Sequence, residues 1–241
     1  MQPLNPPETV GGIAAELISV GFARRYAGEI EPALAARGLI DWKGFAQSWD
    51  DLGLDLYMAD GGRYRRRRHT LFNRAAEGLV RQERRPHYQS RDYNALNGGI
   101  ARWFEPVKDE VAGHPALRAA LDLAYDSFNR ITPHNSWEIE LHQFRISAAV
   151  GNAGQPTPEG MHRDGVDFVM VMLIRRENVQ SGVTIIEDTA HSKLDSFTLG
   201  EPMDATFVDD HRVFHGVTPI VPIDPGQPAW RDVLVTTFRR I

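Results

Sequence analysis

The spacing of apolar side chains changes once along the chain. Up to Pro133, apolar residues recur at intervals of three and four, which is the period of an amphipathic helix. Beyond Ser136 they occur in short apolar or alternating runs, which are typical of strands. The residues between, Pro133-His134-Asn135-Ser136, interrupt both patterns. The helical spacing in the first part of the chain predicts helices over 12–30, 31–49 and 115–130.

The short apolar or alternating runs beyond Ser136 predict a set of short strands separated by Gly, Pro, Asn and Asp turns. The predicted strands cover 138–148, 167–174, 183–187, 205–209, 212–218 and 232–239. Many short strands with tight turns favour an antiparallel barrel or jelly roll over a parallel sheet with intervening helices. We therefore predict an α+β fold with a mainly β core, braced by N-terminal helices. Residues 1–241 would form one domain, with a mainly helical bracing region at 1–135 and a jelly-roll core at 136–241.

Length and composition are those of a soluble globular protein. The chain has 241 residues, of which 42% are hydrophobic, enough to bury a substantial core. No stretch approaches the roughly 20 apolar residues that span a bilayer, and the N-terminus lacks the pattern of a signal peptide. A cytoplasmic location is therefore expected. The net charge of −5 favours a small-molecule partner over nucleic acid or a membrane.

The chain contains no cysteine, which restricts its chemistry. Disulfides, thiolate metal ligands and a cysteine nucleophile are excluded. A metal site would have to use histidine and carboxylate, and these ligands favour iron, manganese or zinc.

The most conspicuous charge block is RYRRRRH at 63–69. Such a block is found in nucleic-acid arms and phosphate sites, but in an acidic chain it more often balances carboxylates of the same protein. If it forms a strand, alternate arginines point to opposite faces. One or two of them would then enter a pocket and hold a substrate carboxylate.

The segment His162-Arg163-Asp164 suggests a metal site. On an extended chain, residues two apart project to the same side, so His162 and Asp164 point together. One distant histidine would complete two imidazoles and a carboxylate, the ligand set of non-heme Fe(II) oxygenases. His215, between apolar Phe214 and Gly216, is preferred to His211, which lies in a polar turn. Alternatively, the segment is a surface turn with a hydrogen-bonded histidine.

A late arginine suggests an anion site near these residues. Arg231 begins the apolar strand that ends the chain, and a buried guanidinium is suited to hold the far carboxylate of a dicarboxylate. Arg239 has the same strand parity and is the alternative. Either arginine could instead form an ordinary ion pair.

Several segments together resemble the bacterial 2-oxoglutarate and Fe(II)-dependent dioxygenases that hydroxylate free L-amino acids, the L-isoleucine 4-hydroxylase type. The similar segments are GMHRDGVDF at 160–168, RENV at 176–179 with Gly182, HGVTPI at 215–220, NGGIARWFEP at 97–106 and GGRYRRR at 61–67. The resemblance extends roughly from residue 55 to the end of the chain. It implies a double-stranded β-helix, the jelly-roll or cupin-like barrel.

The resemblance also implies the site and the reaction. His162, Asp164 and His215 would bind Fe(II), and Arg231 would anchor 2-oxoglutarate. Arg145, on the strand predicted over 138–148, is a further candidate to hold the carboxylate of the amino acid, the alternative being a salt-bridge partner. 2-Oxoglutarate and O₂ would be consumed, succinate and CO₂ released, and an aliphatic carbon hydroxylated.

Two other functions fit the same residues. A zinc hydrolase would use the three ligands to activate water and would need no dicarboxylate anchor. A non-catalytic jelly-roll binder would use His162 and Asp164 only for hydrogen bonds and would not bind iron.

Overall fold

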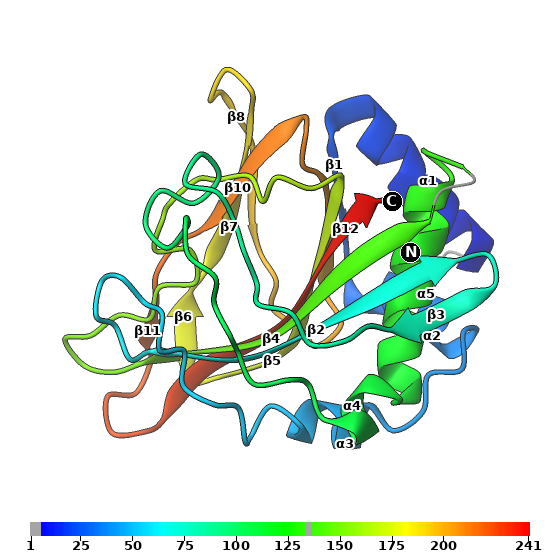
Figure 1. Ribbon diagram of the computed structural model, residues 1–241. Coiled ribbons are helices and arrows are strands. Elements are labelled where there is room, and N and C mark those ends of the chain that lie inside the picture. The colour runs from blue at the N-terminus through cyan, green and yellow to red at the C-terminus, as the bar shows by residue number, and fades with distance from the viewer. Residues whose placement is uncertain (1–5, 134–135) are drawn as a thin grey trace.

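The computed structural model describes residues 6–133 and 136–241, and one long antiparallel sheet, the main sheet, runs through it (Figure 1). Within these ranges the main sheet has seven strands in the order β1-β9-β5-β12-β4-β2-β3. In that order the strands are Phe22–Arg25, Ala205–Asp209, Phe168–Glu177, Ala229–Arg240, Trp137–Ala148, Arg65–Ala75 and Gly78–Arg81.

A second layer, the small sheet, faces one side of the main sheet. It consists of β10 (Val213–Val217), β7 (Val183–Asp188) and β8 (Lys193–Thr198), all antiparallel. A short pair, β6 (Val179–Ser181) with β11 (Ile220–Pro222), lies at one end.

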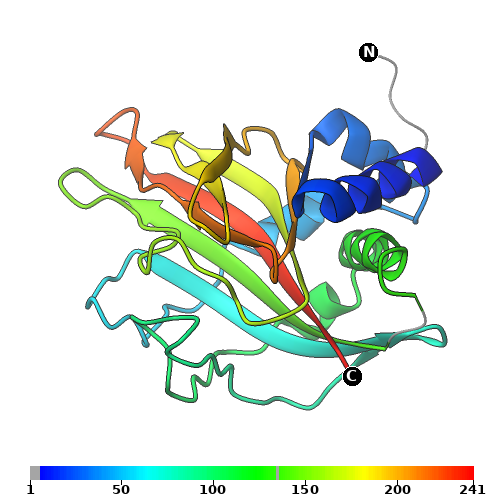
Figure 2. The ribbon, with the colours of Figure 1, turned by 90° about the horizontal axis from the view of Figure 1, so that it is seen from above.

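The helices cover the opposite side of the main sheet, as the view from above shows (Figure 2). They are α1 (Pro6–Val20), α2 (Ala27–Ala35), α3 (Trp42–Gln47), α4 (Asp109–Ala112) and α5 (Pro115–Asn129). Their apolar residues share one buried cluster with one face of the main sheet. The other face of the sheet forms a separate buried cluster with the small sheet.

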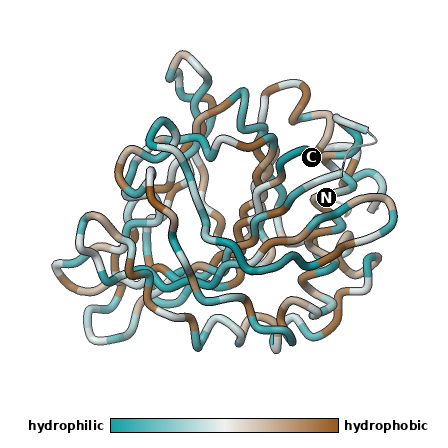
Figure 3. The backbone as a smooth tube through the Cα atoms, in the orientation of Figure 1, coloured by the Kyte–Doolittle hydropathy of each residue, from teal (hydrophilic) through white to brown (hydrophobic). Residues whose placement is uncertain are grey.

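Strand β5 shows how one sequence serves both layers. Met170 and Met172 belong to the cluster beneath the helices, whereas Val169 and Leu173 belong to the cluster beneath the small sheet. This follows from the two-residue period of a strand. A strand buried on both faces reads as continuously apolar, while strands with one polar face change hydropathy repeatedly along their length (Figure 3).

Two of the predicted helices are wrong in extent. The helix expected over 12–30 ends at Val20, because Gly21 adopts the left-handed conformation (φ 84°) that terminates helices, and β1 follows. The helix expected over 31–49 is interrupted at Gly38 (φ 83°), between α2 and α3. The helix expected over 115–130 is confirmed as α5, whose first residue is Pro115.

The expected mainly helical bracing region (1–135) also contains three strands of the main sheet. Strand β1 pairs with β9 and β2 pairs with β4 of the expected jelly-roll core (136–241), while β3 extends the sheet beside β2. Both regions therefore contribute to one continuous sheet and one apolar cluster. The break between helical and strand spacing was expected at 133–136, and two of its residues, His134 and Asn135, lie outside the described residues. Residues 1–5, which were part of the N-terminal stretch judged not to be a signal peptide, also lie outside them.

The six predicted strands are confirmed as β4, β5, β7, β9, β10 and β12. Strand β8 was not predicted, because KLDSFT lacks an apolar run and its residues are mostly exposed. The fold is α+β with a jelly-roll core, as predicted. In the described ranges, no helix is long and apolar enough to cross a membrane.

Candidate active site

The segment that carries His162 lies beside β10 and pairs with it through His215. The His162 backbone N–H donates to the His215 carbonyl, and the His215 N–H donates to the His162 carbonyl, both at 3.0 Å. This antiparallel pairing puts residues 53 positions apart directly opposite each other, with ring centroids 4.5 Å apart. Asp164, two residues along, joins the same side.

The three side chains present one donor atom each to a common point. All three donor atoms lie within 4.8 Å of one another, with His215 Nε2 3.4 Å and His162 Nε2 3.9 Å from the Asp164 carboxylate. Nδ1 of His162 is 3.1 Å from the Gly160 carbonyl. Because a carbonyl only accepts, Nδ1 carries the proton and the Nε2 lone pair remains for a metal. These donors fit a divalent iron, with two nitrogens and one carboxylate oxygen.

The turn that carries Asp164 is held by a second carboxylate. Buried Asp210 accepts the backbone N–H groups of Asp164, Gly165 and Val166 at 2.9, 2.7 and 3.1 Å. The Gln89 side-chain amide lies 3.3 Å from Asp164 Oδ1. Asp164 is therefore oriented by its own backbone and by a neighbouring donor.

The charge on Asp164 is balanced by its histidine neighbours. Burial raises the pKa of this carboxyl, but the hydrogen bond from His215 and the two nearby imidazoles outweigh it and lower the pKa to about 2. Burial lowers the pKa of His215, and Asp164 outweighs this effect, so the net shift is upward. The carboxylate is thus ionised and ready to bind a cation.

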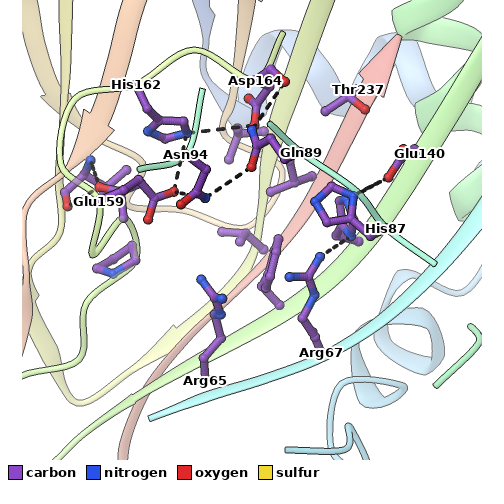
Figure 4. Close-up of a pocket in the computed structure, with 18 of the residues that line it drawn as sticks. Arg65, Arg67, His87, Gln89, Asn94, Glu140, Glu159, His162, Asp164 and Thr237 are labelled. Carbon is purple, nitrogen blue, oxygen red and sulfur yellow. Dashed lines mark hydrogen bonds and ion pairs between the residues drawn. The ribbon is translucent and has the colours of Figure 1, made fainter. Parts of the chain in front are cut away.

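These residues line a cavity between the main and small sheets. The irregular segment 82–108, between β3 and α4, contributes five lining residues: His87, Tyr88, Gln89, Asn94 and Arg102. Figure 4 shows Glu159 and His162 on one side, and Arg65 and Arg67 rising from β2 on the other. The cavity therefore combines donors from both sheets and from segment 82–108.

Arg231 enters the cavity from β12. Its residue is 2% exposed, and its Nε and Nη2 have no hydrogen-bond partner among the described residues. Burial and the nearby cation of Arg176 lower the pKa of Arg231 to about 10, while Asp232 opposes them. A buried guanidinium without a partner is costly, so this arginine is suited to receive an anion.

Two arginines of the 63–69 block also line the cavity. Arg65 and Arg67 face it, whereas Arg66 is exposed, so the expected alternation of the strand is confirmed. Both pair with buried Asp55, at 2.8 and 3.6 Å. The Arg67 guanidinium also lies 3.7 Å from the ring centroid of Phe104. These two cations are therefore already partnered.

A second group of potential ligands surrounds Glu140. His69 Nε2 and His87 Nδ1 lie 3.0 and 2.5 Å from Glu140 Oε2. Nδ1 of His142 lies 2.7 Å from the Arg67 guanidinium, which only donates, so the His142 proton is on Nε2. That tautomer leaves no Nε2 lone pair for a metal. The group is best described as a hydrogen-bonded network that joins β2, β4 and segment 82–108.

Arg145 does not reach the cavity, which corrects its predicted role. Its strand parity turns it toward the helices, where it makes two 2.7 Å hydrogen bonds to buried Asp232 and one of 2.9 Å to Asp50. Both partners are carboxylates of this chain. We therefore do not assign substrate binding to Arg145.

The two alternative residues also have defined places. The His211 side chain is 65% exposed and lies 3.4 Å from Asp167, outside the cavity lining. Arg239 lines the outer part of the cavity and lies 3.4 Å from the Gly165 carbonyl. The structure thus brings together His162, Asp164, His215 and Arg231.

Four residues of the site were missed from the sequence. Asp210 and Gln89 act through contacts between distant segments, and no local pattern marks them. Glu159 directly precedes GMHRDG, and Arg102 lies inside NGGIARWFEP. Because both residues lie in or next to segments that resemble the family, this position could have marked them as candidate site residues.

Comparisons with known proteins agree with this chemistry. The chain is 27% identical over 198 residues to the 3(1)-hydroxy-L-isoleucine 4-dioxygenase of Pantoea ananatis (strain AJ13355), which covers 80% of this chain and 79% of that protein. It is 29% identical over 157 residues to the L-isoleucine-4-hydroxylase of Bacillus thuringiensis, covering 63% and 64%.

Solved structures share the fold. A bsmA homolog from Methylobium petroleophilum PM1 matches with a TM-score of 0.87 and 38% identity, covering 98% of this chain and 94% of that one. IDO from Bacillus thuringiensis matches with a TM-score of 0.76 at 20% identity, covering 96% and 99%. The model of the 2OG-Fe dioxygenase family matches residues 46–237, which include every candidate ligand. With three iron-type donors and a buried cation in one jelly-roll cavity, the chain belongs to the 2OG-Fe dioxygenase family.

Proposed function

We propose that this dioxygenase hydroxylates an aliphatic carbon of a free L-amino acid and forms succinate and CO₂ from 2-oxoglutarate. The observation that carries the proposal is that one cavity contains both the three-donor set and the Arg231 guanidinium, whose Nε and Nη2 have no hydrogen-bond partner among the described residues. The substrate class is supported by the two relatives, whose names specify L-isoleucine or its hydroxylated form.

In this proposal His162, Asp164 and His215 would hold Fe(II). The bound metal would supply oxidative decarboxylation of 2-oxoglutarate coupled to insertion of an oxygen atom into a C–H bond. Asp210 keeps the Asp164 turn in place through its three backbone contacts. The Gln89 side-chain amide donates to the Asp164 carboxylate itself.

Arg231 is proposed to grip the carboxylate of 2-oxoglutarate that is remote from the metal. A guanidinium fork binds a carboxylate with two parallel hydrogen bonds, and burial strengthens them by excluding water. Apolar Phe144, Val171 and Val233 line the same cavity and keep it dry. Substrate position then decides which carbon reacts.

The zinc hydrolase and the non-catalytic binder are less well supported. Neither needs a buried cation near the metal ligands, and the chain belongs to a family of iron oxygenases. The cytoplasmic location expected from the sequence stays a proposal.

The first test is spectroscopic. Anaerobic Fe(II) and 2-oxoglutarate should give the weak visible charge-transfer band of the chelated complex, and His162→Ala should abolish it because one ligand is lost. His211→Ala serves as the matched control and should keep the band. Succinate release measured across the free L-amino acids then identifies the substrate, and no release with any of them would refute the proposed substrate class.

The anchor is tested separately. Arg231→Met should raise the KM for 2-oxoglutarate by about 10- to 100-fold, because charged hydrogen bonds of roughly 1.5–3 kcal/mol are lost. Arg239→Met should change it little. The reverse order of effects would assign the anchor to Arg239.

A further inference from the structure

A second buried arginine lines the cavity with guanidinium nitrogens that no described residue binds. Arg102 is 2% exposed, and its Nε and Nη2 have no hydrogen-bond partner in the described part of the chain. Its backbone is fixed by two 2.9 Å hydrogen bonds with His87, one in each direction. Because its backbone is held and its side chain lines the cavity, the guanidinium is presented to whatever binds there.

The neighbouring charges do not neutralise Arg102. Asp55 is the nearby carboxylate on the β2 side, and it already serves Arg65 and Arg67. Glu140 is surrounded by imidazole donors. Burial and Arg65 lower the pKa of Arg102 more than Asp55, Glu159 and Glu140 raise it, so the net shift is downward. A buried guanidinium whose Nε and Nη2 have no hydrogen-bond partner among the described residues is suited to receive an anion from the cavity.

A carboxylate oxygen without a partner faces the same cavity. Oε2 of Glu159 is buried and has no hydrogen-bond partner among the described residues. Its other oxygen, Oε1, is 3.4 Å from the Asn94 amide and 3.9 Å from His162 Nε2. Glu159 also raises the pKa of Arg102, so these two opposite charges that line the cavity attract each other.

We propose that Arg102 and Glu159 bind the two charged groups of the amino-acid substrate, Arg102 the α-carboxylate and Glu159 the α-ammonium. The inference rests on the proposed function, because it requires a free amino acid. It replaces the role predicted for Arg145, and it leaves Arg231 for the co-substrate. Each of the two buried arginines with unpaired nitrogens among the described residues then has one carboxylate ligand: Arg102 the amino acid and Arg231 2-oxoglutarate.

This arrangement also accounts for selection of a free amino acid. An amino acid within a peptide has neither an α-ammonium nor an α-carboxylate, so it would leave both Arg102 and Glu159 buried and unpaired. Glu159 Oε1 lies 3.9 Å from His162 Nε2, so a head group held there places the amino acid beside the metal site.

The test measures binding of L-isoleucine to the enzyme loaded with Fe(II) and 2-oxoglutarate under anaerobic conditions. Arg102→Met should weaken L-isoleucine binding by about 10- to 100-fold, the loss expected for a charged hydrogen-bonded pair. Affinity for 2-oxoglutarate and the charge-transfer band should be retained, which shows that the variant folds. Arg84→Met is the matched control, because Arg84 lies on the same segment but binds the Phe104 carbonyl.

Substrate analogues separate the two contacts. 2-Methylbutylamine lacks the carboxylate, so Arg102→Met should not weaken its binding further. 3-Methylpentanoate lacks the ammonium, so Glu159→Gln should not weaken its binding, although the same variant weakens L-isoleucine. Equal L-isoleucine affinity in the wild type and Arg102→Met would overturn the inference alone. A wild type that forms the band but binds no free L-amino acid would overturn the proposed substrate class, and the inference with it.

Discussion

At the scale of single residues, the site depends on groups that do not touch the metal or the substrates. Asp210 is the clearest case, since one buried carboxylate accepts three successive backbone N–H groups. Burial raises the pKa of Asp210, and the nearby Asp164 carboxylate raises it further. Two carboxylates are thus kept close together, and the backbone dipoles make this tolerable.

We expect Asp210→Asn to weaken Fe(II) binding by about 10- to 100-fold, the usual effect of losing a group that orients a metal ligand. The amide presents one oxygen to three donors, so the Asp164 turn loosens. Anaerobic titration monitored by the charge-transfer band measures this. Asp224→Asn, in the turn between β11 and β12, is the control. An unchanged iron affinity in Asp210→Asn would mean that the turn holds its shape without this carboxylate.

At the scale of elements, strand parity decides which charged residues meet the cavity. On β4, Glu140, His142 and Phe144 face the cavity, while Arg145 faces the helices. On β12, Arg231 faces the cavity and Asp232 faces away, where it pairs with Arg145 and Arg175. Of these two neighbours on β12, Arg231 therefore has the proposed functional role and Asp232 has a structural role.

Arg145→Met should lower the free energy of unfolding by about 2 kcal/mol, because charged hydrogen bonds to a fully buried Asp232 are lost. The KM for the amino acid should stay the same, since Arg145 does not line the cavity. Urea unfolding and steady-state kinetics measure the two effects. Arg24→Met is the control, because it removes a partly exposed ion pair with Asp195, 4.0 Å between the charged atoms. It should lower the free energy of unfolding by less than about 1 kcal/mol. A raised KM without lost stability would restore the substrate role for Arg145.

At the scale of the whole molecule, segment 82–108 is attached to the sheet through the network around Glu140. His87 comes from this segment, His69 from β2, and Glu140 and His142 from β4. Burial lowers the pKa of all three histidines, against the opposing effect of Glu140 on His69 and His87. Arg67 and Arg102 add to the lowering. Protonation of these imidazoles therefore opposes folding.

Stability should consequently fall as the pH drops from 6.5 to 4. The pKa of His87 is about 4 in the folded protein and 6.5 for an ordinary imidazole, so the unfolded chain binds more protons in this window. His87 alone would contribute about 3 kcal/mol over the window, and Glu140, whose pKa is lowered from 4.5, adds a further loss at lower pH. Urea unfolding with a chelator present should show a shallower decline for His87→Asn than for the wild type. Parallel declines would mean that His87 does not titrate in this way.

The local sequence determined much of this protein. The two-residue period predicted that His162 and Asp164 point together and that the arginines of 63–68 alternate between faces. Six strands and the last long helix followed from apolar spacing, and the absence of cysteine restricted the metal ligands to histidine and carboxylate. These features depend on bond geometry and on nearest neighbours, which the sequence contains directly.

Tertiary structure decided the rest. The place of His215 opposite His162 depends on pairing between segments 53 residues apart, and Arg145 faces the helices because of how the main sheet packs. The sequence shows an arginine at 102 and at 145 but not which of them lacks a counter-charge. Whether a buried charge has a partner depends on all the chain segments around it, and only the folded chain brings those segments together.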